Sequence, residues 1–212
     1  MSTVAQKFVL DQHYVFWNMD RKGYRTILEA VGGKRLRHTY DDGVLEIMSP
    51  SRNHERYKRF LARMVETMTF ELRIPIQSLG SLTMSPTEDR GLEPDECYFL
   101  TKELDCSRNA AWDPLTDPAP DLAIEIEVTN SIRPRLPIFA KLKIREIWTY
   151  DGEELKFLCL GSNHEYQPAP QSLAFPFLTP HDLMRFLGMI GELDENSILH
   201  LFIDWLNGID NV

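Results

Sequence analysis

Glutamates inside an otherwise apolar segment constrain this chain more than any other feature. The segment PDLAIEIEVTNS begins at Pro120 and carries Glu125 and Glu127 between aliphatic residues. A β-strand alternates its faces with a period of two residues, so both glutamates are predicted to point to one side. The residues predicted to point to the opposite side are Leu122, Ile124, Ile126 and Val128. Carboxylates in so apolar a strand are unfavourable unless they are paired or bind a metal ion.

A third carboxylate, Asp95, lies early in another predicted strand, within GLEPDECYFL. We expect residues 93–99 and 121–128 to be adjacent strands of one sheet, which brings Asp95 and Glu125 within reach of one cation. Converging acidic groups repel each other, and a divalent cation with oxygen ligands relieves that repulsion. The spacing equally allows an alternative in which both glutamates lie on a solvent-exposed face of the strand.

Length and composition bound the class of protein. With 212 residues, 43% of them hydrophobic, the chain is expected to form one domain over residues 1–212, with a C-terminal helical tail at about 180–206. The sequence has no apolar run long enough to span a membrane, and its first residues lack the apolar core of a signal peptide. The cysteines at 97, 106 and 159 follow no metal-ligand spacing, so they are expected to be reduced thiols of a cytoplasmic protein.

The net charge of −9 argues against indiscriminate binding of nucleic acid. Any nucleic acid must therefore meet a local basic surface or metal ions. A predicted helix at about 52–72 offers one such surface, because Arg52, Arg56, Arg59 and Arg63 recur along one of its faces. An ordinary solvent-exposed helix face explains the same stripe and is the favoured interpretation.

A short helix is predicted after the Glu125 strand, beginning near Pro134. Arg135 falls in the middle of its buried face. An arginine directed inward near a helix N-terminus needs a carboxylate partner, so Arg135 is expected to reach Glu125 or Glu127. Elsewhere, local signals predict helices near 20–31, 180–189 and 195–206, hairpins over 35–48 and 145–160, a strand at 74–84 and a long loop at 101–119.

Four segments together carry a family resemblance: TYDDGVLEIMSPSRNHE, GLEPDECYFL, PDLAIEIEVTNS and REIWTYDG. In order and spacing they resemble the Uma-type family of bacterial restriction endonucleases, within the PD-(D/E)XK nuclease superfamily, over about residues 15–206. The resemblance implies an α/β fold of the restriction-endonuclease-like kind, with a mixed central β-sheet flanked by α-helices. It also implies hydrolysis of phosphodiester bonds with a divalent metal ion, usually Mg²⁺.

Site residues follow from the resemblance one position at a time. Asp95 matches the aspartate of the first half of the motif, and Glu125 matches the acidic residue of the second half, so both would be metal ligands. Glu55 matches the helix glutamate of the family and would help to hold the metal. The superfamily pattern places a lysine two residues after the glutamate, where this chain has Glu127. In this family the basic role has moved to the following helix, at the position of Arg135.

Arginine at that position limits the chemistry, because a guanidinium stays protonated and cannot act as a general base. It can stabilise charge on a phosphate. We therefore expect a metal-dependent endonuclease in which a cation, Mg²⁺ or Mn²⁺, lowers the pKa of the attacking water, with DNA as the expected nucleic acid. The cation is expected between Asp95, Glu125 and either Glu127 or Glu55, so Glu127 counts with Asp95, Glu125 and Arg135 among the expected catalytic residues. The alternative is a catalytically weak or inactive nuclease-fold module for nucleic-acid binding or protein interaction. A homodimer is expected from the acidic surface and the apolar residues of the tail.

Overall fold

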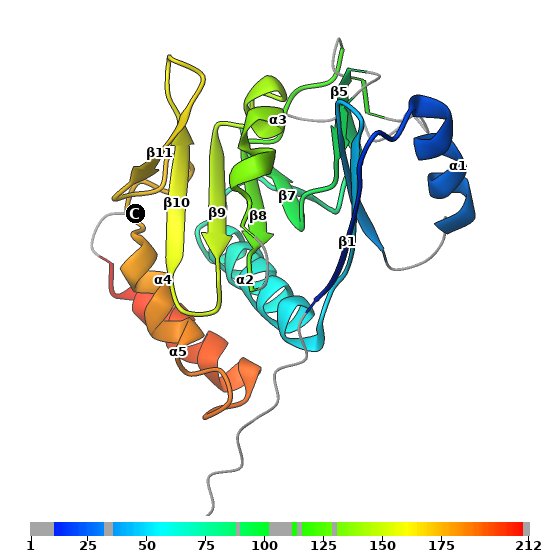
Figure 1. Ribbon diagram of the computed structural model, residues 1–212. Coiled ribbons are helices and arrows are strands. Elements are labelled where there is room, and N and C mark those ends of the chain that lie inside the picture. The colour runs from blue at the N-terminus through cyan, green and yellow to red at the C-terminus, as the bar shows by residue number, and fades with distance from the viewer. Residues whose placement is uncertain are drawn as a thin grey trace, which may run out of the picture.

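Two β-sheets and five α-helices make up the described part of the chain (Figure 1). The computed structural model describes residues 11–31, 36–87, 90–101, 112–113, 116–128 and 131–209. Most of the expected loop at 101–119 and Cys106 therefore lie outside the described residues. Within the described part, none of the helices combines the length and the apolar character that crossing a membrane requires.

The first sheet is antiparallel and has five strands, ordered β1-β3-β2-β6-β5. Its strands are β1 (Gln12–Phe16), β2 (Arg37–Asp41), β3 (Val44–Ser49), β5 (Met84–Thr87) and β6 (Arg90–Leu92). The turn between β2 and β3 has positive φ at both Asp42 (43°) and Gly43 (86°), which matches the twist of an antiparallel hairpin. The hairpin predicted there is confirmed. Helix α1 (Arg21–Val31) covers one face of this sheet, where Tyr24 stacks on Tyr40.

The second sheet is mixed and has six strands, ordered β11-β10-β9-β8-β7-β4. Its strands are β4 (Gln77–Gly80), β7 (Glu96–Phe99), β8 (Leu122–Ile126), β9 (Glu146–Tyr150), β10 (Leu155–Leu160) and β11 (Tyr166–Ala169). Strands β8 and β9 are parallel, and the remaining pairs are antiparallel. The α/β fold class is confirmed, although the expected single central sheet is divided in two. The strand predicted at 74–84 is likewise divided, because the chain turns at Gly80 (φ 59°) between β4 and β5.

Helices pack on both faces of β8. On one face, Leu122, Ile124 and Ile126 join a core that includes Phe60, Leu61 and Met64 of α2 (Arg52–Glu71). On the other face, Ala123 joins a second core with Ile138 and Phe139 of α3 (Leu136–Lys141). The strand is therefore buried on both sides, and Glu125 is only 1% exposed. For Glu125, the alternative of a solvent-exposed strand face is wrong.

The chain passes from the first sheet to the second at residues 93–95. Strand β6 ends at Leu92, Pro94 interrupts the pairing, and β7 begins at Glu96. Glu96 pairs with Ile124 of β8, so the predicted adjacency of these two segments is confirmed. Asp95 consequently lies at the junction of the two sheets, immediately before β7.

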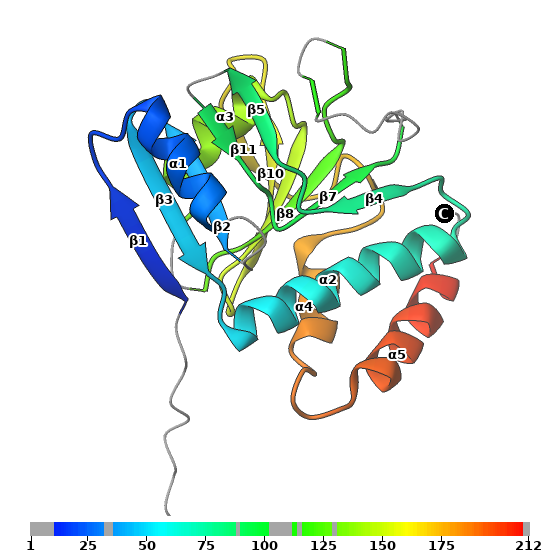
Figure 2. The ribbon, with the colours of Figure 1, turned by 90° about the vertical axis from the view of Figure 1, so that its right-hand side faces the viewer.

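The C-terminal helices α4 (Pro180–Leu187) and α5 (Glu195–Asn207) lie where two helices are predicted, and α5 packs along α2 (Figure 2). Arg63 of α2 forms an ion pair of 2.8 Å with Glu195 of α5, and Arg56 lies 3.8 Å from the same carboxylate. Two of the four arginines of the stripe thus pair with a carboxylate of the tail. Leu193 and Leu201 remain exposed on the tail, and the homodimer stays a prediction.

Candidate active site

Asp95 is buried at the sheet junction and is held by two hydrogen bonds and one ion pair. His54 Nε2 lies 3.0 Å from Oδ1, and Arg37 Nε forms an ion pair of 3.0 Å with the same oxygen. The backbone N–H of Ile126 donates to Oδ2 over 2.7 Å. Burial by itself raises the pKa of Asp95, but the hydrogen bond from His54 and the charges of Arg37 and His54 outweigh it and lower the pKa to about 2. The carboxyl group is therefore ionised and held in one orientation.

A second carboxylate, that of Asp11, contacts the other ring nitrogen of His54. His54 is fully buried, and its Nδ1 lies 3.3 Å from Asp11 Oδ2, while Asp11 Oδ1 accepts the N–H of Ser51. Burial lowers the pKa of His54, but the hydrogen bond and charge of Asp95, with the charge of Asp11, raise it overall. A doubly protonated imidazole donates from both nitrogens and fits between two carboxylates. The result is a buried chain of three side chains that fixes Asp95.

Glu125 has one partnered and one unpartnered oxygen. Arg135 Nη2 lies 2.8 Å from Glu125 Oε2, which confirms the expected contact between the short helix and the strand. Glu125 Oε1 is buried and has no hydrogen-bond partner among the described residues. Burial raises the pKa of Glu125 to about 7, opposed by the charge of Arg135 and reinforced by that of Asp95. A buried acceptor without a donor marks a place for a ligand, since such atoms are almost always partnered in native proteins.

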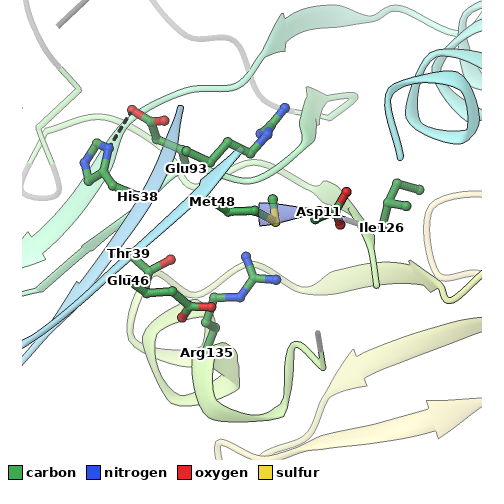
Figure 3. A pocket seen from close by; sticks show the side chains of 9 residues that line it. Asp11, His38, Thr39, Glu46, Met48, Glu93, Ile126 and Arg135 are labelled. Carbon is green, nitrogen blue, oxygen red and sulfur yellow. Dashed lines mark ion pairs between the residues drawn. The ribbon is translucent and has the colours of Figure 1, made fainter. Parts of the chain in front are cut away.

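A small cavity between the two sheets reaches the two arginines that pair with these carboxylates, while Asp95 and Glu125 are not among its lining residues (Figure 3). Arg37 and Arg135 both line it, from β2 and from the turn before α3, respectively. Figure 3 shows Arg135 extending toward Glu46 of the first sheet. The full lining is Asp11, Arg37, His38, Thr39, Glu46, Met48, Glu93, Ile126 and Arg135. Two guanidinium groups beside two carboxylates suit an anion that arrives together with a cation.

Glu127 lies beyond the end of β8 and outside this cavity lining. It is half-buried, accepts the N–H of Ile132 over 3.1 Å, and lines a neighbouring cavity with Thr149 and Lys156. Its charge, after those of Glu125, Asp95 and Glu46, helps to raise the pKa of Arg135 against the effect of burial. Glu127 therefore acts on the same arginine from a different position, and a direct catalytic role for it stays a prediction.

The structure does not bring Glu55 to the carboxylates, contrary to expectation. Its side chain is 53% exposed, and its nearest cation is Lys58 at 4.0 Å. His54, one residue earlier, contacts Asp95 instead. The sequence contained a signal for this, because His54 precedes Leu61 by seven residues and so shares the apolar face of α2. Asp11 and Arg37 were also missed, and no local pattern singles them out.

The donor set fits a magnesium-like cation rather than a closed metal cage. Among the described residues, no three His, Cys, Asp or Glu side chains are arranged to hold a metal ion. Mg²⁺, however, is usually bound by one or two carboxylates, and waters and substrate phosphates complete its coordination. Asp95 and Glu125, with the free Oε1, match that pattern. Because Arg37 and Arg135 already balance both carboxylates, cation affinity without a phosphate ligand is expected to be weak.

Comparisons with known proteins identify a similar fold and the family of the chain. A crystal structure described as "a putative nuclease belonging to DUF820", from Anabaena variabilis, has a similar fold, with a TM-score of 0.50 and 19% identity. The similarity covers 71% of this chain and 90% of that chain. Among curated proteins, none matches the chain. The model of the Uma2 family, described as "Putative restriction endonuclease", matches residues 26–187, most of the chain, and the protein therefore belongs to the Uma2 family.

Proposed function

We propose that this protein is an endonuclease that hydrolyses phosphodiester bonds of DNA with a divalent cation, Mg²⁺ or Mn²⁺, held by Asp95 and Glu125. Restriction-endonuclease-like families generally use divalent metal ions. The observation that carries the proposal is the unpartnered Oε1 of Glu125, buried beside Asp95 next to a cavity lined by two arginines. The large majority of buried carboxylate oxygens in native proteins have a hydrogen-bond partner.

The residues of the chain have separable roles in this proposal. His54, Arg37 and the N–H of Ile126 hold Asp95 ionised and in place, so that it does not reorganise during the reaction. Arg135 stabilises negative charge that develops on the phosphate, but cannot remove a proton from water because a guanidinium remains protonated. When bound, a divalent cation supplies Lewis-acid stabilisation of the phosphate and a more acidic water.

One observation favours a second candidate function. The ion pairs Arg37–Asp95 and Arg135–Glu125 neutralise both carboxylates within the protein. A cluster balanced in this way is stable without a cation, as expected of a nuclease-fold module that binds nucleic acid or protein without cleaving it. The two candidates differ in cation affinity and in cleavage.

The decisive experiment measures both properties on matched variants. Mn²⁺ and Mg²⁺ are titrated by calorimetry into the wild type, Asp95→Ala and Glu55→Ala, with a non-cleavable oligonucleotide present to complete the coordination. We expect cation binding to be lost in Asp95→Ala and retained in Glu55→Ala, whose carboxylate is exposed and lines a separate hollow with Arg37 and Glu93. Cleavage of mixed DNA and RNA substrates is expected to follow the same order, with DNA preferred. If the wild type neither binds the cation nor cleaves, the binding-module candidate replaces the nuclease.

A further inference from the structure

An exposed aromatic surface lies at the free edge of the first sheet. Strand β1 is terminal in that sheet and pairs only with β3 among the described strands. Tyr14 is 56% exposed, Phe16 40% and Trp17 72%. We call these three residues the aromatic edge. Large aromatic side chains exposed next to each other mark an interaction surface, because monomeric proteins seldom expose contiguous apolar patches to water.

The register of β1 decides which side of the sheet these rings occupy. Tyr14 and Phe16 lie opposite Ile47 and Leu45 of β3. Those two residues face α1, since they share a core with Tyr24 of that helix. Tyr14 and Phe16 therefore lie on the side of the sheet that α1 covers, and Trp17 lies in the bend between β1 and α1, which begins four residues later (Figure 2).

The exposed side of α1 is basic in its first turns. Arg21, Lys22 and Arg25 line one shallow hollow that includes a single carboxylate, Glu29. Lys22 and Arg25 are exposed and form no ion pair with the described residues. In a chain of net charge −9, this concentration of positive charge is complementary to a polyanion. The arginine stripe on α2 is less available, because Glu195 binds two of its members, Arg56 and Arg63.

We propose that the aromatic edge and the first turns of α1 bind a single-stranded stretch of nucleic acid. Exposed rings bind nucleic acid by stacking on bases, while cationic side chains follow the phosphates. Bases in an intact duplex are already stacked on each other and leave no free face for a protein ring. A surface that combines three exposed rings with a basic helix thus favours single strands over duplexes.

The position of β1 connects this surface to the candidate active site. The opposite face of β1 carries His13 and Val15, which lie opposite Met48 and Glu46 of β3. Met48 and Glu46 line the cavity that contains Arg135. A single-stranded nucleic acid bound on the aromatic edge therefore needs only to cross β1 to approach the cavity. The inference rests on the proposed function in so far as it names the substrate class, a nucleic acid with unpaired nucleotides.

Fluorescence anisotropy with a labelled oligothymidylate, in EDTA to prevent cleavage, tests the inference. We expect Trp17→Ala to weaken binding about tenfold, within the range for the loss of one stacked base. Trp17→Phe should restore much of the affinity because it keeps a ring, and Lys22→Glu combined with Arg25→Glu should weaken binding and its salt dependence. Phe70→Ala is the matched control, since Phe70 is 80% exposed but lies on α2. A duplex of equal length should bind more weakly and be less sensitive to Trp17→Ala.

Three results would overturn the inference: no binding by the wild type, equal binding by the wild type and Trp17→Ala, or a wild-type preference for duplex. Light scattering tests whether a second copy of the chain, rather than nucleic acid, covers the aromatic edge. A dimer that Trp17→Ala converts to a monomer, with oligonucleotide binding unchanged, would assign the aromatic edge to a second copy of the chain. Because binding is measured in EDTA, it is independent of cleavage. Binding that depends on Trp17 in a protein that never cleaves would defeat the nuclease proposal and leave this inference intact.

Discussion

Glu125 and Glu146 are buried glutamates on adjacent strands of the same sheet, and their surroundings differ. Glu146 on β9 is fully buried, and its two oxygens accept the indole N–H of Trp148 and the backbone N–H of Ala174, each over 2.8 Å. Glu125 on β8 has a guanidinium on one oxygen and no hydrogen-bond partner for the other among the described residues. Burial raises the pKa of both carboxyl groups.

The difference separates a structural carboxylate from a candidate functional one. Neutral donors satisfy both oxygens of Glu146, and through Ala174 they attach β9 to the segment that leads into α4. Glu146 therefore has no unpartnered oxygen to which a ligand could bind. Glu125 instead combines a compensating charge with a free acceptor beside Asp95, a combination that a bound cation or phosphate can use. Burial and a raised pKa alone therefore do not identify the site; the unsatisfied oxygen together with the neighbouring Asp95 distinguishes it.

The largest expected effect concerns Arg135. Arg135→Ala leaves Glu125 buried and uncompensated, which is expected to lower the free energy of unfolding by about 3–5 kcal/mol at pH 8. For a chain of this length the melting temperature should fall by roughly 10 °C. Arg135→Lys should melt close to the wild type, and in a catalytic site it should also preserve or raise cleavage, because lysine is the usual superfamily residue. Thermal melts of the three proteins measure this. An unchanged melting temperature in Arg135→Ala would show that Glu125 is not charged when folded.

The next largest expected effect is a loss of cleavage that occurs when Glu125 is replaced but not when Glu146 is replaced. Glu125→Gln is expected to reduce Mn²⁺-dependent cleavage by about 10²–10³-fold, the usual effect of removing one group that stabilises a transition state. Glu146→Gln, the matched control, should retain cleavage and instead lose roughly 1–3 kcal/mol of stability, because one amide group cannot accept from both donors as well. Initial rates on labelled DNA, with melts of each variant, provide the measurement. Similar rates for the two variants would remove the distinction drawn between them.

The smallest expected effect is a pH dependence of stability in metal-free protein. The pKa of Glu125 is about 7 in the folded protein, against an ordinary value of 4.5, so the folded state binds the proton more tightly. The stability that this group contributes is full below about pH 4.5 and is lost as the pH rises toward 7. The pKa of Asp95 is shifted in the opposite direction, so the stability that Asp95 contributes is lost only as the pH falls from 3.8 to about 2. The pH ranges in which Asp95 and Glu125 affect stability therefore do not overlap. Urea unfolding at several pH values should show the wild type losing stability relative to Glu125→Gln across this window. A constant difference would contradict the raised pKa.

Several features of the fold could be predicted from local sequence patterns. The alternation of Leu122, Ile124 and Ile126 predicted the strand and its apolar face, whereas the second core, on the side of Glu125, comes from the packing of α3. The aspartate and glycine at 42–43 determine a hairpin turn, since few other residues accept positive φ. Helix periodicity predicted that Arg135 reaches Glu125 or Glu127, and the contact with Glu125 is formed from the turn just before α3 rather than from within the helix. All of these predictions depend on the period of a strand or helix or on the conformational limits of single residues.

Only the tertiary structure decided how Asp95 is held. His54 and Arg37 reach it across 41 and 58 positions of sequence, and Asp11 reaches His54 across 43. Local periodicity carries no information about which distant side chains meet, because that depends on how the chain crosses from one sheet to the other at Pro94. The same limit explains Glu55: its motif position indicated the site, but the packing of α2 turned His54 inward and left Glu55 in solvent. The sequence determined that a charged site exists on β8, and the packing of α2 and the first sheet determined which residues complete it.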